Sequence, residues 1–230
     1  MKLSNYNESV NDLKKNLIKI YQNFSPTIYA SSLAAEDMVI TDLILINKIP
    51  IQIFTLDTGR LHNETIEMIE LIKKKYDYEI IICKPDLKKI NNFVNIYGLN
   101  AFYKSISLRK ECCNIRKVEP LNFVLKDYYS WITGQRREQS ESRREIQLKE
   151  YDETKKIFKF NPIFNWSDNF VWNYLNKNNV PYNSLYKKGF SSIGCKPCTR
   201  PIIKGEEKRA GRWWWENNET KECGLHSNNI

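Results

Sequence analysis

Hydrophobic positions in the first two thirds of the chain follow two alternating periodicities. Leu13, Leu17 and Ile20 fall on one face of a helix, whereas short runs rich in β-branched residues interrupt the later amphipathic segments. The pattern predicts strands at 27–30, 49–57, 78–83 and 128–134, and helices at 9–24, 35–48 and 64–76. This β-α-β-α-β order predicts an α/β fold, with a parallel sheet flanked by helices.

Polar motifs follow three of the predicted strands. They are SSLAAED at 31–37, DTGR at 57–60 and TGQRR at 133–137. Parallel sheets bind ligands at the carboxyl ends of their strands, so we expect a binding site there. Beyond residue 150 the pattern loosens, and a short helix capped by Ser167 precedes a turn-rich segment. We expect this segment to extend the same domain rather than to form a second core.

Composition and charge narrow the class of protein. The 230 residues are 41% hydrophobic and 27% charged, as in an ordinary globular protein. No apolar run approaches the roughly 20 residues that span a bilayer. Residues 1–16 lack the apolar block of a secretory signal peptide, so we expect a cytoplasmic protein. The net charge is +9, and four of the ten arginines lie at 136–144, which favours phosphate or sulfate recognition. No basic-aromatic repeat or helix-turn-helix pattern indicates nucleic-acid binding.

Four of the six cysteines form two pairs far apart in the sequence. Cys112 and Cys113 are adjacent, and Cys195 and Cys198 form a C-x-x-C, which by itself is compatible with a redox dithiol, zinc or iron–sulfur. Two such pairs suggest four thiolates on one metal centre. Neighbouring side chains diverge, so the tandem pair favours a larger cubane cluster, with a zinc ion as the alternative.

The segment CCNIRKVEP at 112–120 predicts a helix that begins near the tandem cysteines. Both thiols would then lie near its N-terminus, where the helix dipole favours thiolates. Lys117 follows Cys113 by one turn and would lie on the same face, between an anionic cluster and an anionic substrate. The alternative for Lys117 is an ordinary solvated lysine.

The remaining cysteines differ from each other in context. Cys83 closes an apolar strand, which favours a packing role. Cys223 lies in the C-terminal KECGLH, next to a glycine and three residues before His226. If GEEKRAGRWWW upstream is helical, Arg209 and Arg212 share a face, and such cations make a thiol nucleophilic. The alternatives for Cys223 are an incidental cysteine or a fifth metal ligand. The alternative for His226 is an ordinary surface residue.

Eight motifs together give a resemblance to a known family. They lie at 31–39, 54–65, 112–121, 133–140, 180–186, 189–202, 206–216 and 221–226. In this set and order they resemble the assimilatory adenylyl-sulfate and phosphoadenylyl-sulfate reductases. The resemblance implies an adenine nucleotide α-hydrolase-like fold, related to the PP-loop enzymes, over residues 1–205. Residues 206–230 would form a C-terminal arm that carries the nucleophile.

The resemblance also implies a cofactor and a substrate. Members with the paired cysteines carry a 4Fe–4S cluster and mostly use adenylyl sulfate, so Cys112, Cys113, Cys195 and Cys198 are the expected ligands. Members without them mostly use the 3′-phosphorylated substrate, and some cluster-bearing members accept both. The SSLAAED segment would be a modified phosphate-binding loop, in which Ser31, Ser32 and backbone N–H groups bind an oxyanion.

The expected substrate-binding residues are Ser31, Ser32, Asp57, Lys117, Gly134, Arg136, Arg137, Arg143, Arg209 and Arg212. One departure from the family pattern lies after TGQRREQS, where ESRRE lacks the usual proline and is one residue shorter. Arg143 matches the family arginine better through the REI that follows, and Arg144 is the alternative.

The implied reaction reduces adenosine 5′-phosphosulfate to sulfite and AMP for cysteine biosynthesis. Cys223, with His226 nearby, would attack sulfur to give a cysteine S-sulfonate, and thioredoxin would release sulfite. Members of the family are often oligomers. Two other classes remain as alternatives. A PP-loop ATP pyrophosphatase usually shows SGGxDS where this chain has SSLAAED, and a zinc module for nucleic acid would have no turnover.

Overall fold

The computed structural model describes residues 3–216 and 225. The described residues form two compact units, each assembled from three stretches of chain. The first unit comprises 3–55, 67–81 and 127–183, and the second comprises 56–66, 82–126 and 184–216 together with 225. The boundary predicted after residue 205 lies within the second unit and stays a prediction.

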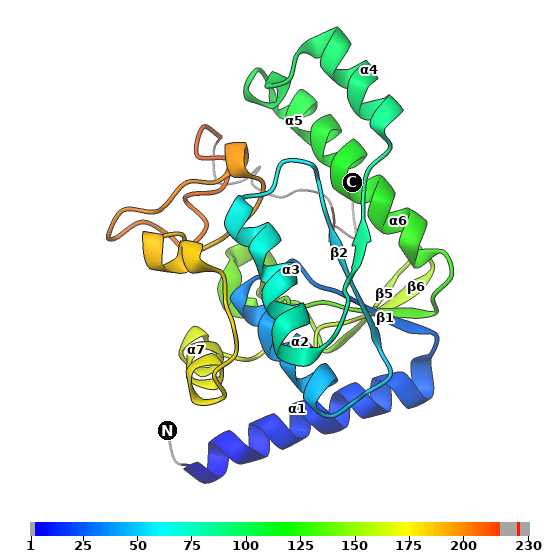
Figure 1. Ribbon diagram of the computed structural model, residues 1–230, viewed down its shortest axis with the longest axis vertical. Helices are drawn as coiled ribbons and strands as arrows, with labels where there is room; N and C mark the ends of the chain where they lie inside the picture. The colour runs from blue at the N-terminus through cyan, green and yellow to red at the C-terminus, as the bar shows by residue number, and fades with distance from the viewer. Residues whose placement is uncertain (1–2, 217–224, 226–230) are drawn as a thin grey trace. The chain divides into compact units, whose positions relative to one another are not determined.

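A six-stranded, mostly parallel sheet confirms the predicted fold class (Figure 1). Its strands are β1 (Thr27–Ala30), β2 (Gln52–Leu56), β3 (Ile81–Cys83), β4 (Ser130–Ile132), β5 (Lys149–Asp152) and β6 (Ile157–Phe160), in the order β3-β2-β1-β4-β6-β5. β1 pairs in parallel with β2 and β4, and β4 pairs in parallel with β6. The antiparallel pair of β5 and β6 was not predicted.

The central strands are short and buried. All three residues of β4 are buried, and β1 is buried except at Ala30, as expected for strands covered on both faces. Each strand ends where a polar motif begins: Ser31 follows β1, and Thr133 follows β4. The fold therefore places the SSLAAED and TGQRR motifs at the carboxyl ends of neighbouring strands.

Four helices occupy the places that the periodicity predicted. They are α1 (Leu3–Phe24), α2 (Ala35–Ile46), α3 (Asn63–Tyr76) and α7 (Asp168–Lys177). The predicted cap of α7 is confirmed, because Ser167 Oγ accepts a hydrogen bond from the backbone N of Phe170 at 3.2 Å. Asp42 on α2 accepts hydrogen bonds from Tyr76 and Tyr174 at 2.6 and 2.7 Å, which ties α2 to α3 and α7.

The second unit contains most of the remaining helical segments. They are α4 (Leu87–Tyr97), η1 (Ala101–Tyr103), α5 (Ile106–Cys113), the π-helical η2 (Asn114–Val118), α6 (Glu119–Leu125), η5 (Ser184–Lys188) and η6 (Lys196–Cys198). Figure 1 traces α5, η2 and α6 as one helical run, with α4 beside it. Short 3-10 turns in the first unit are η3 (Arg137–Gln139) and η4 (Glu141–Arg143).

The helix of the tandem cysteines begins earlier than predicted. Ser105 Oγ accepts from the backbone N of Leu108 at 3.2 Å, and this cap starts α5 at Ile106. Cys112 and Cys113 therefore lie at the C-terminal end of α5. The prediction that a helix N-terminus favours their thiolates is wrong. Across the described ranges, no helix combines the length and the apolar character that crossing a membrane requires.

Candidate active site

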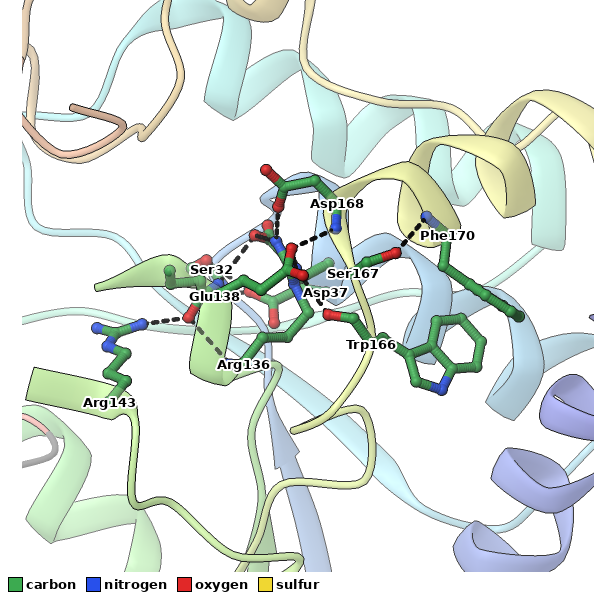
Figure 2. Close-up of polar contacts among 11 residues, drawn as sticks. Ser32, Asp37, Arg136, Glu138, Arg143, Trp166, Ser167, Asp168 and Phe170 are labelled. Atoms are coloured by element: carbon green, nitrogen blue, oxygen red, sulfur yellow. Dashed lines mark hydrogen bonds and ion pairs between the residues drawn. The ribbon is translucent and has the colours of Figure 1, made fainter. Parts of the chain in front are cut away.

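The loop after β1 is held by a buried carboxylate of α2. Asp37 Oδ2 accepts hydrogen bonds from the backbone N and from Oγ of Ser32, at 2.6 and 2.5 Å (Figure 2). Ser31 donates its backbone N to the carbonyl of Phe54, and Leu33 takes a positive φ of 62°. Both donors of Ser32, which the sequence assigns to an oxyanion, thus bind Asp37 in this structure.

Asp37 itself has an unusual environment. Burial raises its pKa to about 6, against the lowering effect of the hydrogen bonds from Ser32. Gly134, at the end of β4, packs directly on it, because a Cβ at this position would lie 2.0 Å from Asp37 Oδ1. Gly134 therefore belongs to the site through close approach, since any larger residue would displace the carboxylate.

Arg136 is buried among carboxylates. It pairs with Glu36 at 2.8 Å and with Asp168, and its Nη1 donates to the carbonyl of Trp166 at 2.9 Å (Figure 2). Its Nε is buried and has no hydrogen-bond partner within the described ranges. Most of this guanidinium is therefore used inside the protein, and its predicted contact with substrate stays a prediction.

The other arginines of this loop differ in how far their side chains are exposed to solvent. Arg137 stacks over the ring of Phe164 and donates Nε to the carbonyl of Ile146 at 2.9 Å. Arg143 donates to Gln139, whereas Arg144 is mostly exposed and pairs with Glu141. Of the two competing arginines, Arg143 is the one that joins the cluster around Arg136.

In the second unit, the four cysteines of the predicted quartet line one cavity. The cavity measures about 390 Å³, including its open mouth, and Cys112, Cys113, Cys195 and Cys198 all contribute to its wall. The same wall carries five cationic residues, namely Arg60, Arg109, Arg116, Lys117 and Arg212. The five described cysteines form no disulfide, so the thiols of this quartet are available as ligands.

The donor set of this cavity fits an anionic, thiolate-ligated cluster. Trp213 Nε1 and Arg212 Nε are buried without hydrogen-bond partners in the part of the chain that the structure describes. Such donors and the surrounding cations stabilise negative charge on sulfur. Among the described residues, no group of three or more His, Cys, Asp or Glu side chains has the geometry to hold a single metal ion.

The cationic wall acts unequally on the thiols. Burial alone would raise the pKa of Cys195, but Lys117, the hydroxyl of Thr58 at 3.2 Å and Arg212 outweigh it and lower that pKa. Burial raises the pKa of Cys198 to about 12, and the neighbouring Cys195 adds to the effect. Burial also raises the pKa of Cys112.

Several residues at the cavity were not predicted to belong to the site. Arg60, Arg109 and Arg116 line it, and the hydroxyl of Thr58 lies 3.2 Å from Cys195 Sγ. The π-helical turn after Cys113 contains Arg116, whose Nη1 donates to the carbonyl of Thr58 at 2.7 Å. Single π turns are rare and often mark functional sites. Thr58 and Arg60 belong to DTGR, and Arg109 and Arg116 lie within four residues of the tandem cysteines, which is the signal that the sequence offers for them.

The remaining predicted residues fall in different places. Residues 206–216 form turns rather than a helix, so the condition under which Arg209 and Arg212 would share a helical face is not met. Arg212 stacks on Trp213 and donates to the carbonyl of Ile193 at 3.2 Å. Asp57 Oδ1 accepts from the backbone N of Gly59. Cys223 and His226 lie outside the described residues.

Comparisons of sequence agree on one group of proteins. Residues 26–201 match the phosphoadenosine phosphosulfate reductase domain. The chain is 52% identical to an adenosine 5′-phosphosulfate reductase from Burkholderia cepacia, over 93% of this chain and 86% of that protein. It is 47% identical to the adenosine 5′-phosphosulfate reductase of Allochromatium vinosum, over 91% of this chain and 82% of that protein.

Comparisons of structure agree on the fold. A phosphoadenylyl-sulfate reductase from Candida auris, in complex with phosphate, superposes with a TM-score of 0.70 at 22% identity. The match covers 88% of this chain and 98% of the other. Yeast FAD synthetase superposes with a TM-score of 0.57 at 15% identity, over 86% of this chain and 67% of the other.

Proposed function

Because the chain belongs to the phosphoadenosine phosphosulfate reductase family, we propose that it reduces adenosine 5′-phosphosulfate to sulfite and AMP in sulfate assimilation. Relatives of about 50% identity that cover most of the chain carry the name of that oxidoreductase. The observation that carries the proposal is the convergence of four thiols and five cations on one cavity.

The proposed cofactor is a 4Fe–4S cluster on Cys112, Cys113, Cys195 and Cys198. The thiols line one cavity, and the cations around them offset the charge of a tetrathiolate centre. When bound, such a cluster would supply a fixed anionic centre beside the cations of the cavity. Lys117, a wall residue of the same cavity, is proposed to bind the negative charge of the nucleotide substrate.

The proposed nucleophile is Cys223. Its thiolate forms a bond to the sulfur of the activated sulfate, the bond from that sulfur to the bridging oxygen breaks, and AMP leaves with the electron pair. Arg209 and Arg212 are proposed to stabilise the charge that develops on the departing phosphate. The roles of His226 and of the arginines at 136, 137 and 143 are proposed on the family resemblance.

The proposed reductant is an external dithiol protein such as thioredoxin. Four described cysteines line the cavity, and Cys83 ends β3, where burial raises the pKa of its thiol. The first thiolate of the dithiol attacks Cys223 Sγ and displaces sulfite, and the second resolves the mixed disulfide. The dithiol loses two electrons to the sulfonate sulfur, and its protons pass to solvent. A reducing compartment, the cytoplasm, suits this chemistry.

A single substitution tests the nucleophile. Cys223→Ser should abolish sulfite formation, because a serine hydroxyl cannot form the S-sulfonate, while substrate binding and metal content stay unchanged. Anaerobically purified enzyme is incubated with labelled adenosine 5′-phosphosulfate, and the adduct on Cys223 is located by mass spectrometry. Cys83→Ser is the matched control and should retain activity. Sulfite production by Cys223→Ser would reject the assignment.

Substrate choice is tested in the same assay. We expect turnover of adenosine 5′-phosphosulfate to exceed turnover of its 3′-phosphorylated form. The name of the matched domain favours the phosphorylated substrate as the second candidate. Faster turnover of that form would favour the second candidate. Release of pyrophosphate from ATP would identify a PP-loop pyrophosphatase instead.

A further inference from the structure

A buried ion pair holds Glu216, the last residue of the described range 3–216. Arg109 on α5 donates Nε to Glu216 Oε1 at 2.9 Å and Nη2 to Glu216 Oε2 at 2.7 Å. The side chain of Arg109 is 0% exposed and that of Glu216 is 4% exposed. This two-point geometry fixes both the distance and the orientation of the carboxylate, which a lysine in place of Arg109 could not do.

Trp213 joins this pair to the cysteine cavity. The guanidinium of Arg109 lies 4.8 Å from the centre of the indole ring, and Trp213 belongs to one hydrophobic cluster with Cys113, Cys195 and Cys198. The backbone N of Trp213 donates to the carbonyl of Cys198 at 3.0 Å, and the backbone N of Glu216 donates to the carbonyl of Trp213 at 2.8 Å. The chain up to residue 216 is thus attached to the wall of the cavity.

We propose that Arg109 and Glu216 are positioning residues that fix the point from which the C-terminal segment delivers Cys223. This inference rests on the proposed function, because it takes Cys223 as the nucleophile. Cys223 lies seven residues after Glu216, a stretch that spans at most about 25 Å when fully extended. The place where the segment starts therefore limits where the thiol can go.

The chemistry of the pair supports positioning over simple stability. Replacing a buried ion pair by apolar residues often leaves stability unchanged, so such a pair is weak evidence for a stabilising role. A bidentate pair instead selects one arrangement of the two chain segments. Arg109 also precedes the tandem cysteines by one helical turn on α5, so the same helix carries two of the four proposed metal ligands and the residue that holds Glu216.

The test compares two charge-removing substitutions. Glu216→Gln removes one partner of the buried pair, and Glu206→Gln removes the partner of Arg200 in a similar two-point pair of the same unit, with both N–O distances at 2.8 Å. Each variant is assayed anaerobically at saturating adenosine 5′-phosphosulfate in a single turnover without reductant. The readouts are the rate of adduct formation on Cys223, the dissociation constant for substrate, the iron content and hydrogen–deuterium exchange of residues 213–216.

We expect Glu216→Gln to slow adduct formation by about tenfold or more, because small misplacements of a reacting group are costly. Substrate affinity and iron content should stay unchanged, and the amide of residue 216 should exchange faster. Glu206→Gln should match the unsubstituted protein in adduct formation. An unchanged rate or unchanged exchange in Glu216→Gln would overturn the inference.

A double variant covers the case in which Glu216→Gln does not fold. Arg109→Met with Glu216→Met removes both charges and keeps the interior apolar. It should fold and bind substrate but form the adduct slowly, and an adduct rate equal to that of the unsubstituted protein would overturn the inference. If the unsubstituted protein forms no adduct on Cys223, the proposed function fails instead. The exchange measurement then decides by itself whether the pair anchors the segment.

Discussion

At the scale of single residues, the main feature of the site in the first unit is the carboxylate of Asp37, whose burial disfavours its charged form. Asp37 is buried, receives two hydrogen bonds from Ser32 and touches Gly134. Its pKa of about 6 lies above the ordinary value of 3.8, because burial disfavours the charged form. The folded protein therefore binds a proton at Asp37 more tightly than the unfolded chain does.

The sign of this shift gives a prediction for pH. The stabilising contribution of Asp37 is fully present below about pH 4 and is lost as the pH rises through about 6, a loss of about 2–3 kcal/mol. Asp37→Asn removes this titration, so its stability relative to the unsubstituted protein should rise between pH 4 and pH 7. Urea unfolding at several pH values measures the difference.

A second aspartate provides the control for this experiment. The ammonium of Lys155 and the hydroxyl of Thr154 donate to Asp152, and despite burial they hold its pKa below the ordinary value. Its contribution is present at neutral pH and is lost as the pH falls, the opposite sign. Asp152→Asn should therefore lose stability relative to the unsubstituted protein as the pH rises. The same trend in both variants would contradict the environment described for Asp37.

Single residues could be grouped from the sequence where the spacing of like residues is typical of a shared ligand. Two cysteine pairs separated by about 80 residues were grouped because thiolates share a metal, and they do line one cavity. Arg109 and Arg116 were missed, because a single arginine on a helix has no spacing that distinguishes a buried ligand-facing cation from a solvated one. Only the packed structure shows which cations face the thiols.

At the scale of elements, the parallel strands were predictable and the cysteine helix was not. Buried strands appear as continuous apolar runs, as at β1 and β4. The start of α5 depends on the Ser105 cap, which the apolar pattern does not reveal. β5 was missed because its residues, Lys149–Asp152, are mostly charged and only partly buried.

The Ser105 cap gives a prediction at this scale. Ser105→Ala should cost about 1 kcal/mol of helix stability, because the backbone N of Leu108 loses its acceptor. α5 carries Cys112 and Cys113, two of the proposed ligands, so the variant should also lose the proposed iron cluster faster to a chelator. Ser167→Ala removes the equivalent cap of α7 in the first unit and should leave iron retention unchanged. Equal iron loss in both variants would contradict a specific link between α5 and the metal.

At the scale of the whole molecule, the chain divides its chemistry between two compact units. The first unit contains the buried strand ends with the SSLAAED and TGQRR loops, and the second contains the cysteine cavity. The sequence predicted a single core with a C-terminal arm. Each unit is assembled from three separate stretches, and neither a glycine- or proline-rich linker nor a change in composition marks where the chain passes between them.

Removal of the proposed metal centre should therefore affect the two units differently. Cys195→Ser takes away one proposed ligand, so we expect loss of iron and of visible absorption, because the remaining three thiols no longer complete the set. Amides of the second unit should then exchange faster, while those of β1, β4 and β6 keep their protection. Cys83→Ser should change neither readout. A fully loaded Cys195→Ser protein would remove Cys195 from the ligand set.

The wide turn at 114–118 makes the length of this segment a functional constraint. A π turn amounts to one residue inserted into an α-helix, so deleting one residue there would restore a regular helix. Everything beyond the deletion would then rotate by about 100° around the helix axis relative to the two cysteines before it. A substitution here changes one side chain, whereas a deletion changes the direction of every side chain that follows it in the helix. A homologue with a shorter or longer segment at this place would need another way to direct its cations toward the thiols.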